Sequence, residues 1–233
     1  MLTVTKALTS SIGRKFIMGL SGLALVGFIV AHLAGNLTLF DPSGDMFNAY
    51  AKKLDDLGPL KLLGEFGLIG LFGLHIAMAI GLKVNHRSAR PSRYAMHKSK
   101  KGPSFWNLAS VNMIITGAIL LIFLIIHVKQ FALGPGVDAG YVTQVNGQQA
   151  RDLHRLIVET FKNPMWAAFY CAVMLMLGAH LRHGFWSMFQ SLGAMNARLQ
   201  KPAHLAGLLV GTVLALGFLM LPLYIYFFVG GVS

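Results

Sequence analysis

The chain has 233 residues, of which 55% are hydrophobic and only 12% are charged, whereas typical soluble domains have about 25% charged residues. A soluble domain of this length would expose too much surface for so few charges, and a disordered chain would need more charge and fewer apolar residues. The single cysteine, Cys171, excludes a disulfide framework, a thiolate-held iron–sulfur cluster and a cysteine zinc site. The composition therefore predicts an integral membrane protein.

Five segments have the length and composition of spanning helices, which need about 20 mostly apolar residues. They are residues 16–40, 60–82, 105–133, 164–189 and 204–229. We expect one all-α transmembrane domain that covers residues 1–233. Its first span is too long for a signal peptide and should be retained.

Two of the connecting loops carry apolar residues at helical spacing and predict amphipathic helices at the membrane surface. In the first loop these residues are Phe47, Tyr50, Leu54 and Leu57. In the second loop, within residues 147–162, they are Ala150, Leu153, Ile157 and Phe161.

The charged residues are distributed unevenly between the two sides that the spans define. Thirteen of the 20 Lys and Arg residues fall on the side of the N-terminus and of the loop after the second span. All eight acidic residues fall on the other side, with the remaining seven basic residues. Because cytoplasmic loops carry the excess of Lys and Arg, we expect a cytoplasmic N-terminus, a cytoplasmic 83–101 loop and a C-terminus on the outer side.

The histidines carry most of the chemical information. His32, His75, His127 and His180 lie inside the first four spans, one in each. Ionisable groups within a membrane are costly and usually mark a functional site. The helical rise places His32 and His127 roughly 6 and 13 Å to the outer side of their helix centres, and His75 and His180 about 6 Å to the cytoplasmic side.

Two histidines at one level on non-adjacent helices can bind the two faces of a planar metal cofactor. In a four-helix bundle the first and third helices are diagonal, and so are the second and fourth. The depths therefore predict two haems stacked across the membrane, an outer one on His32 and His127 and an inner one on His75 and His180. The alternative for a single histidine is a hydrogen bond between helices. Zinc is not favoured, because it would gather three or four ligands at one depth.

Glycines in the first two spans allow close approach, either to a flat macrocycle or to another helix. For most of them we favour packing between helices. They are Gly19, Gly22, Gly64, Gly67, Gly70 and Gly73.

Several segments resemble one family of membrane cytochromes. They are Gly13-Arg-Lys-Phe-Ile-Met-Gly-Leu-Ser-Gly22, His32-Leu-Ala-Gly-Asn36, Gly73-Leu-His75, Ile126-His127-Val and the run from His180 to Gly193. Together they are similar to the cytochrome b membrane subunit of bacterial succinate:quinone oxidoreductases, in its single-subunit, five-helix, two-haem form. This form occurs in succinate dehydrogenases and fumarate reductases.

The resemblance implies two haem b groups with His32, His75, His127 and His180 as ligands. His183 competes with His180, but the motif and the depth favour His180. The resemblance also implies a cytoplasmic flavoprotein that interconverts succinate and fumarate, and an iron–sulfur subunit that passes electrons to the membrane subunit. Electrons would leave to a membrane quinone, in this type mostly menaquinone, near the outer haem. The implied location is the bacterial cytoplasmic membrane.

A quinone site needs an apolar slot, hydrogen-bond donors and a proton carrier. Glu65 is our candidate carrier, because it is the only acidic residue inside a predicted span. The alternative is an ordinary glutamate at the membrane surface, and Lys61 and Asn36 are expected at the same level. Some fumarate reductases of this type carry a glutamate two residues before the fourth ligand. This chain has Gly178 there, which argues against a proton path of that kind.

Arg14, Lys15 and Arg182 lie near the cytoplasmic edge and are candidate partners for the propionates of the inner haem, although topology alone also accounts for them. The basic 83–101 loop suits docking of the partner subunits, and attraction to lipid also explains it. We expect four further histidines to be solvated and three tryptophans to anchor the membrane surface. These are His86, His97, His154 and His204, and Trp106, Trp166 and Trp186.

The sequence thus predicts the membrane anchor and di-haem cytochrome b subunit of a succinate:quinone oxidoreductase, in either direction of turnover. Two other classes remain open. One is the cytochrome b subunit of a hydrogenase or formate dehydrogenase, and the placement of one ligand on each of four successive helices argues against it. The other is a transporter or structural membrane protein without a cofactor, and the lack of paired internal repeats argues against a transporter.

Overall fold

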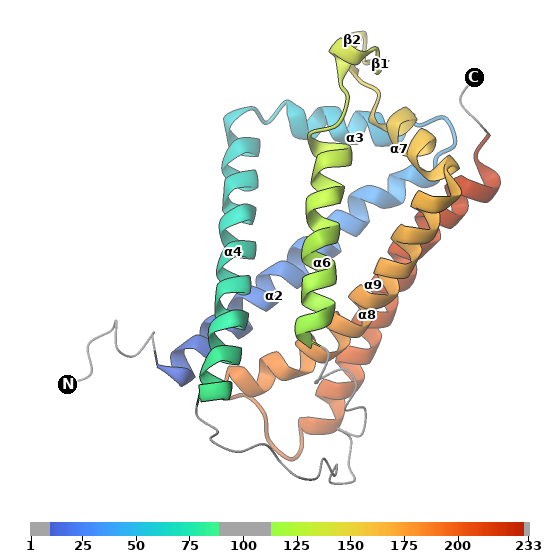
Figure 1. Ribbon diagram of the computed structural model, residues 1–233. Helices are drawn as coiled ribbons and strands as arrows, with labels where there is room; N and C mark the ends of the chain where they lie inside the picture. Colours follow the sequence, from blue (N-terminus) through green and yellow to red (C-terminus); the bar gives the residue numbers. More distant parts are fainter. Residues whose placement is uncertain (1–9, 89–112, 231–233) are drawn as a thin grey trace.

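The structure is a computed structural model and describes residues 10–88 and 113–230, which are mostly helical (Figure 1). In chain order the elements are α2 (Ser11–Asn36), η1 (Leu37–Phe40), α3 (Asp45–Asp55), α4 (Pro59–Ser88), α6 (Met113–His127), η2 (Val128–Ala132), η3 (Val137–Ala139), β1 (Val142–Val145), β2 (Gln148–Arg151), α7 (Leu153–Lys162), α8 (Pro164–Ser191) and α9 (Gln200–Phe228). Here η1 and η3 are 3-10 turns, and η2 is a π-helical turn.

Five helical segments are long and apolar enough to cross a membrane, which supports the prediction of a multi-pass membrane protein. Local capping explains where two of them begin. The Ser10 hydroxyl accepts the Gly13 N–H at 3.0 Å, so α2 begins earlier than expected. Asn163 accepts the Met165 N–H at 2.9 Å, and Pro164 occupies the first turn of α8, where its missing N–H costs nothing. Residues 105–112 of the predicted third span lie outside the described residues.

The long helices pack in the order α4–α2–α8–α6, with α9 against α8 and more lightly against α2. Figure 1 shows α4 and α6 as upright helices with α2 crossing between them on a diagonal. The molecule has two ends. The hairpin end holds α3, the β1–β2 hairpin and α7, and the N-terminal end is where α2 and α9 begin and α4 and α8 finish.

The loop between α6 and α7 corrects one prediction. Residues 147–162 are not one amphipathic helix, because β1 and β2 pair as an antiparallel hairpin and the helix starts only at Leu153. Asn146 and Gly147 turn the hairpin with φ of 53° and 75°, as a tight two-residue turn requires. Ala150 is buried, as the pattern predicted, but from a strand.

The first predicted amphipathic helix is α3, which is shorter than expected. Phe47 is 5% exposed and joins the same apolar core as Ile157 and Phe161 of α7. Leu54 and Leu57 are exposed, and Leu57 lies beyond the end of α3. The short helices of the hairpin end therefore share one apolar core with the long helices, through residues such as Tyr170 of α8 and Ile225 of α9.

Candidate cofactor site

His32 of α2 and His127 of α6 lie together toward the hairpin end. Their ring centroids are 5.8 Å apart and the rings are perpendicular. In the packing order α4–α2–α8–α6, the two helices that carry these residues are separated by α8. Asn36 donates from Nδ2 to the His32 carbonyl oxygen at 2.7 Å, so its side-chain amide is hydrogen-bonded to the backbone of its own helix.

Aromatic rings surround this pair. Phe28 stacks on His32 with centroids 5.4 Å apart, and Phe218 of α9 lies 5.8 Å away on another side. Phe123 stacks on His127 at 5.5 Å, and the buried Tyr170 ring lies at 6.2 Å. These rings pack around the two histidines, which are half-buried, and the contact from α9 was not predicted.

The backbone changes directly after His127. Residues Val128–Ala132 form a π-helical turn, in which the Leu133 N–H donates to the Val128 carbonyl oxygen at 2.9 Å. Single π turns inside α-helices frequently occur at functional sites. Phe131, four residues after His127, lies with its ring centroid 5.3 Å from that of the histidine.

His75 of α4 and His180 of α8 form the second pair, nearer the N-terminal end. They are close enough to interact electrostatically. Ser21 Oγ lies 3.2 Å from His75 Nδ1, and Thr116 Oγ1 lies 3.1 Å from His180 Nδ1. Neither hydroxyl was predicted as part of the site.

The spacing of the first pair suits two ligands on one metal ion. Imidazoles bound to opposite sides of one metal ion through bonds of about 2 Å have ring centres roughly 6 Å apart, and the first pair lies at 5.8 Å. Among residues 10–88 and 113–230, no set of three or more His, Cys, Asp and Glu side chains is placed to hold a metal ion. The histidines are thus arranged in twos, as the two axial ligands of a haem would be.

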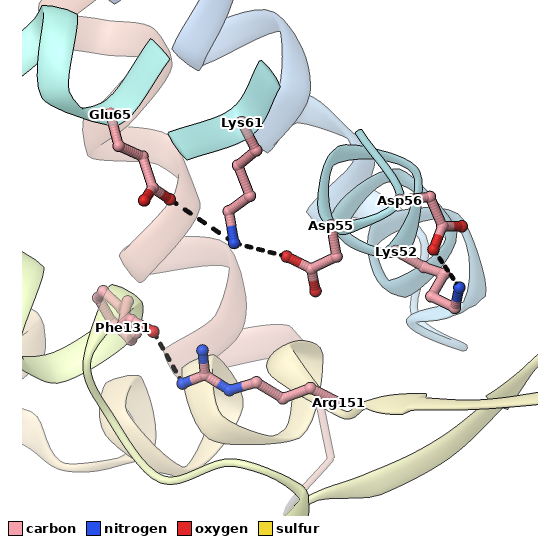
Figure 2. Close-up of polar contacts among 7 residues, drawn as sticks. All are labelled: Lys52, Asp55, Asp56, Lys61, Glu65, Phe131 and Arg151. Carbon is pink, nitrogen blue, oxygen red and sulfur yellow. Dashed lines mark hydrogen bonds and ion pairs between the residues drawn. The ribbon is translucent and has the colours of Figure 1, made fainter. Parts of the chain in front are cut away.

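Glu65 lies at the hairpin end of α4 within a chain of charges (Figure 2). The Lys61 ammonium is 2.7 Å from Asp55 and 3.6 Å from Glu65, and the Glu65 side chain is 52% exposed. Across from them, the Arg151 guanidinium donates to the Phe131 carbonyl oxygen at 2.7 Å. Glu65 is therefore an ion-paired carboxylate near the hairpin end of the span.

The three predicted propionate partners lie at the N-terminal end, but in different places. The Arg14 guanidinium reaches α4, where a Cβ on Gly81 would be 3.3 Å from Nη1. Lys15 is exposed on α2. Arg182 packs at the α8–α9 contact, within electrostatic range of His204.

The expectation of solvated histidines is wrong for His154. Its side chain is 8% exposed, because the loop at Gly44 (φ 78°) passes directly over the ring. The backbone N–H of His154 donates to Asn48 Oδ1 at 3.0 Å, and Asn48 Nδ2 donates to Asp152 Oδ1 at 2.9 Å. Burial lowers the pKa of His154, and the nearby carboxylates of Asp152, Asp41 and Asp45 oppose this shift.

His204 is half-buried: its ring stacks on Trp186 with centroids 4.2 Å apart, and its Nε2 is buried. Trp186 contacts His183 as well, at 5.4 Å, so this tryptophan packs between two histidines at the end of α8. The His86 side chain, His97 and Trp106 lie outside what the structure describes.

The glycines of α4 correct a further prediction. A Cβ on Gly64, Gly67, Gly70 or Gly73 would meet no described atom within 4 Å, so they do not pack against another described helix. Close helix packing occurs instead at Gly178 of α8. A Cβ there would lie 2.8 Å from the Ala215 Cβ of α9.

Comparison with protein-family models, with curated proteins and with solved structures finds no match to this chain.

Proposed function

We propose that this protein is the membrane anchor and di-haem cytochrome b subunit of a bacterial succinate:quinone oxidoreductase, and passes electrons between an iron–sulfur subunit and membrane quinone. The observation that carries the proposal is the arrangement of four intramembrane histidines in two pairs, each drawn from next-but-one helices. The sequence resemblance supplies the type of complex, the succinate or fumarate partner reaction and the menaquinone.

Each pair would hold one haem, with His32 and His127 as ligands toward the hairpin end and His75 and His180 toward the N-terminal end. When bound, the haems would supply two one-electron redox centres at different depths in the membrane. Aromatic rings such as Phe28, Phe123 and Phe218 pack around the first pair. Arg14, Lys15 and Arg182 would bind propionates at the N-terminal end.

The distribution of charge supports a cytoplasmic N-terminal end, where the partner subunits would dock. All eight acidic residues of the sequence lie on the side of the hairpin end, and so do the four ion pairs found in the described residues. Basic residues such as Arg14, Lys15 and Lys83 therefore lie at an end without carboxylates. Such a face suits an acidic partner surface as well as the cytoplasmic leaflet.

At the hairpin end, Glu65 would exchange protons with quinone. Its carboxylate lies near the hairpin end of the span, with the Lys61 ammonium 3.6 Å away. A carboxylate in that place can take up or release the proton that quinone chemistry requires.

Haem quantification on the purified full chain tests the proposal. We expect about two b-type haems per chain, and about one in each of His32→Ala and His75→Ala. His204→Ala is the matched control, because this histidine belongs to neither pair, and it should keep both haems. A well-folded preparation without haem would overturn the proposal. Co-purification then identifies the complex, since hydrogenase or formate dehydrogenase subunits would contradict the succinate assignment.

A further inference from the structure

The two histidines of the second pair share a feature that the first pair lacks. Each has a hydroxyl from a neighbouring helix at Nδ1, Ser21 for His75 at 3.2 Å and Thr116 for His180 at 3.1 Å. The hydroxyl-bearing residues are buried, 3% and 9% exposed. By contrast, Nδ1 of His127 is buried without a hydrogen-bond partner in the described chain.

Counting hydroxyl protons sets the direction of these hydrogen bonds. Ser21 Oγ donates its only proton to the Met18 carbonyl oxygen at 3.1 Å, and Thr116 Oγ1 donates to the Met113 carbonyl oxygen at 3.1 Å. Hydroxyls inside helices commonly make such bonds to their own backbone. With its proton used there, each oxygen acts as an acceptor toward histidine. In this arrangement the proton of each contact belongs to Nδ1.

The two sites also match in the residue after the hydroxyl. Ser21 is followed by Gly22 and Thr116 by Gly117, and a Cβ on these glycines would lie 3.5 and 3.6 Å from Cε1 of His75 and His180. Each imidazole therefore packs against two consecutive residues of the adjacent helix, the hydroxyl-bearing residue and the glycine after it. The same local arrangement arises on two separate helix pairs, α2 with α4 and α6 with α8.

We propose that Ser21 and Thr116 are positioning residues that hold His75 and His180 as Nδ1–H tautomers, so that the lone pair of Nε2 is free to bind iron. This inference rests on the proposed function in that it takes the two histidines as iron ligands. A ring whose other nitrogen donates a hydrogen bond is fixed in tautomer and orientation and becomes a more basic ligand.

Nitrogen-15 NMR of the histidine-labelled full chain, prepared with and without haem, tests the tautomer directly. We expect the haem-free chain to show His75 and His180 protonated at Nδ1. Thr116→Val keeps the shape of the side chain but removes the acceptor, and should shift His180 toward the Nε2–H form. Thr116→Ser should restore the wild-type signal. Ser187→Ala is the matched control, because Ser187 donates to the Gly184 carbonyl oxygen at 3.1 Å in the same way but forms no hydrogen bond with a described histidine.

The haem-loaded chain gives a second readout. We expect Thr116→Val and Ser21→Ala each to weaken haem retention about 10- to 100-fold and to raise the reduction potential of one haem only, because the ligand becomes a weaker electron donor. Thr116→Ser should recover both properties. An Nε2–H tautomer in the wild-type chain would overturn the inference. Nδ1–H tautomers in a chain that never binds haem would overturn the proposed function and leave the hydrogen-bond assignment standing.

Discussion

Gly178 of α8 and Gly211 of α9 lie back to back, so that a Cβ on Gly211 would come within 2.7 Å of the Gly178 carbonyl oxygen. The backbones of the two helices touch here with no side chain between them. A glutamate at residue 178, as in some fumarate reductases, would therefore meet α9 rather than point toward the histidines. The close packing of α8 on α9 is thus a steric obstacle to a carboxylate side chain at this position.

Gly178→Ala should destabilise the α8–α9 contact by about 1–3 kcal/mol, because the added methyl group overpacks it. Gly184→Ala in the same helix should be neutral or stabilising, since its Cβ meets nothing within 4 Å and alanine is the better helix former. Denaturant unfolding in detergent measures both variants. Equal stability of the two variants would contradict the observed packing.

His180→Ala should remove one haem, whereas His183→Ala should retain both. His180 lies beside His75 and is hydrogen-bonded to Thr116, while His183 packs edge-on against Trp186. Pyridine haemochrome analysis of the two variants measures the difference. If His183→Ala were the variant that lost haem, the ligand assignment on α8 would move to that residue.

Glu65→Gln should slow haem reduction by a menaquinol analogue about 100-fold or more, since a missing proton carrier typically costs this much. The haem content should not change. Glu159→Gln is the matched control: Glu159 is ion-paired with Arg155 at 2.8 Å at the same end of the molecule. Stopped-flow spectroscopy of the purified chain gives the rate of haem reduction in both variants. Equal rates would show that Glu65 is only a member of a surface ion pair and not the proton carrier.

The hairpin end should lose stability as the pH falls from about 7 to 5, because burial lowers the pKa of His154. The unfolded chain binds this proton near the ordinary value of about 6.5, whereas the folded chain binds it only at lower pH. Unfolding therefore takes up a proton in this window, and above it the contribution of His154 to stability is fully present.

Hydrogen exchange of the α3 and α7 amides across this pH range measures the effect, after correction for the intrinsic rates. His154→Gln should reduce the change in amide exchange with pH. His204→Gln, at the other end of the molecule, should leave that change as it is in the wild-type chain. Asp41 adds a separate loss at more acidic pH, since hydrogen bonds from the Met46 N–H and from Ser43 lower its pKa. An unchanged slope in His154→Gln would assign the acid sensitivity to the carboxylates.

Composition and periodicity were sufficient to predict the spans, and the spacing of the histidines predicted which of them come together. The β hairpin was missed although its signal is present, because Asn146-Gly147 is a preferred hairpin turn. The helical spacing of Ala150, Leu153, Ile157 and Phe161 masked it. Ala150 fits that spacing by coincidence, since a strand residue can be buried at the same register.

Other features could not be read from the sequence. Ser21 and Thr116 look like ordinary hydroxyls bonded to their own helices, and only the packing of α4 and α8 brings a histidine to each. The burial of His154 depends on the left-handed backbone of Gly44, which folds the loop onto the ring. Both are consequences of tertiary contacts between segments far apart in the chain.

The π-helical turn after His127 has a consequence for the comparison of related sequences. Its hydrogen bond spans five residues instead of four, so the turn accommodates one more residue than an α-helix would. Deletion of one residue within 128–132 would let this turn close as a regular α-helix and leave the residues beyond it near their present direction, because the π turn already absorbs the extra residue. Phe131 would then lie three or four residues after His127 in an α-helix and remain on the same face. A one-residue gap at this place in an alignment would therefore mark the loss of the π turn and not the loss of the aromatic contact to His127.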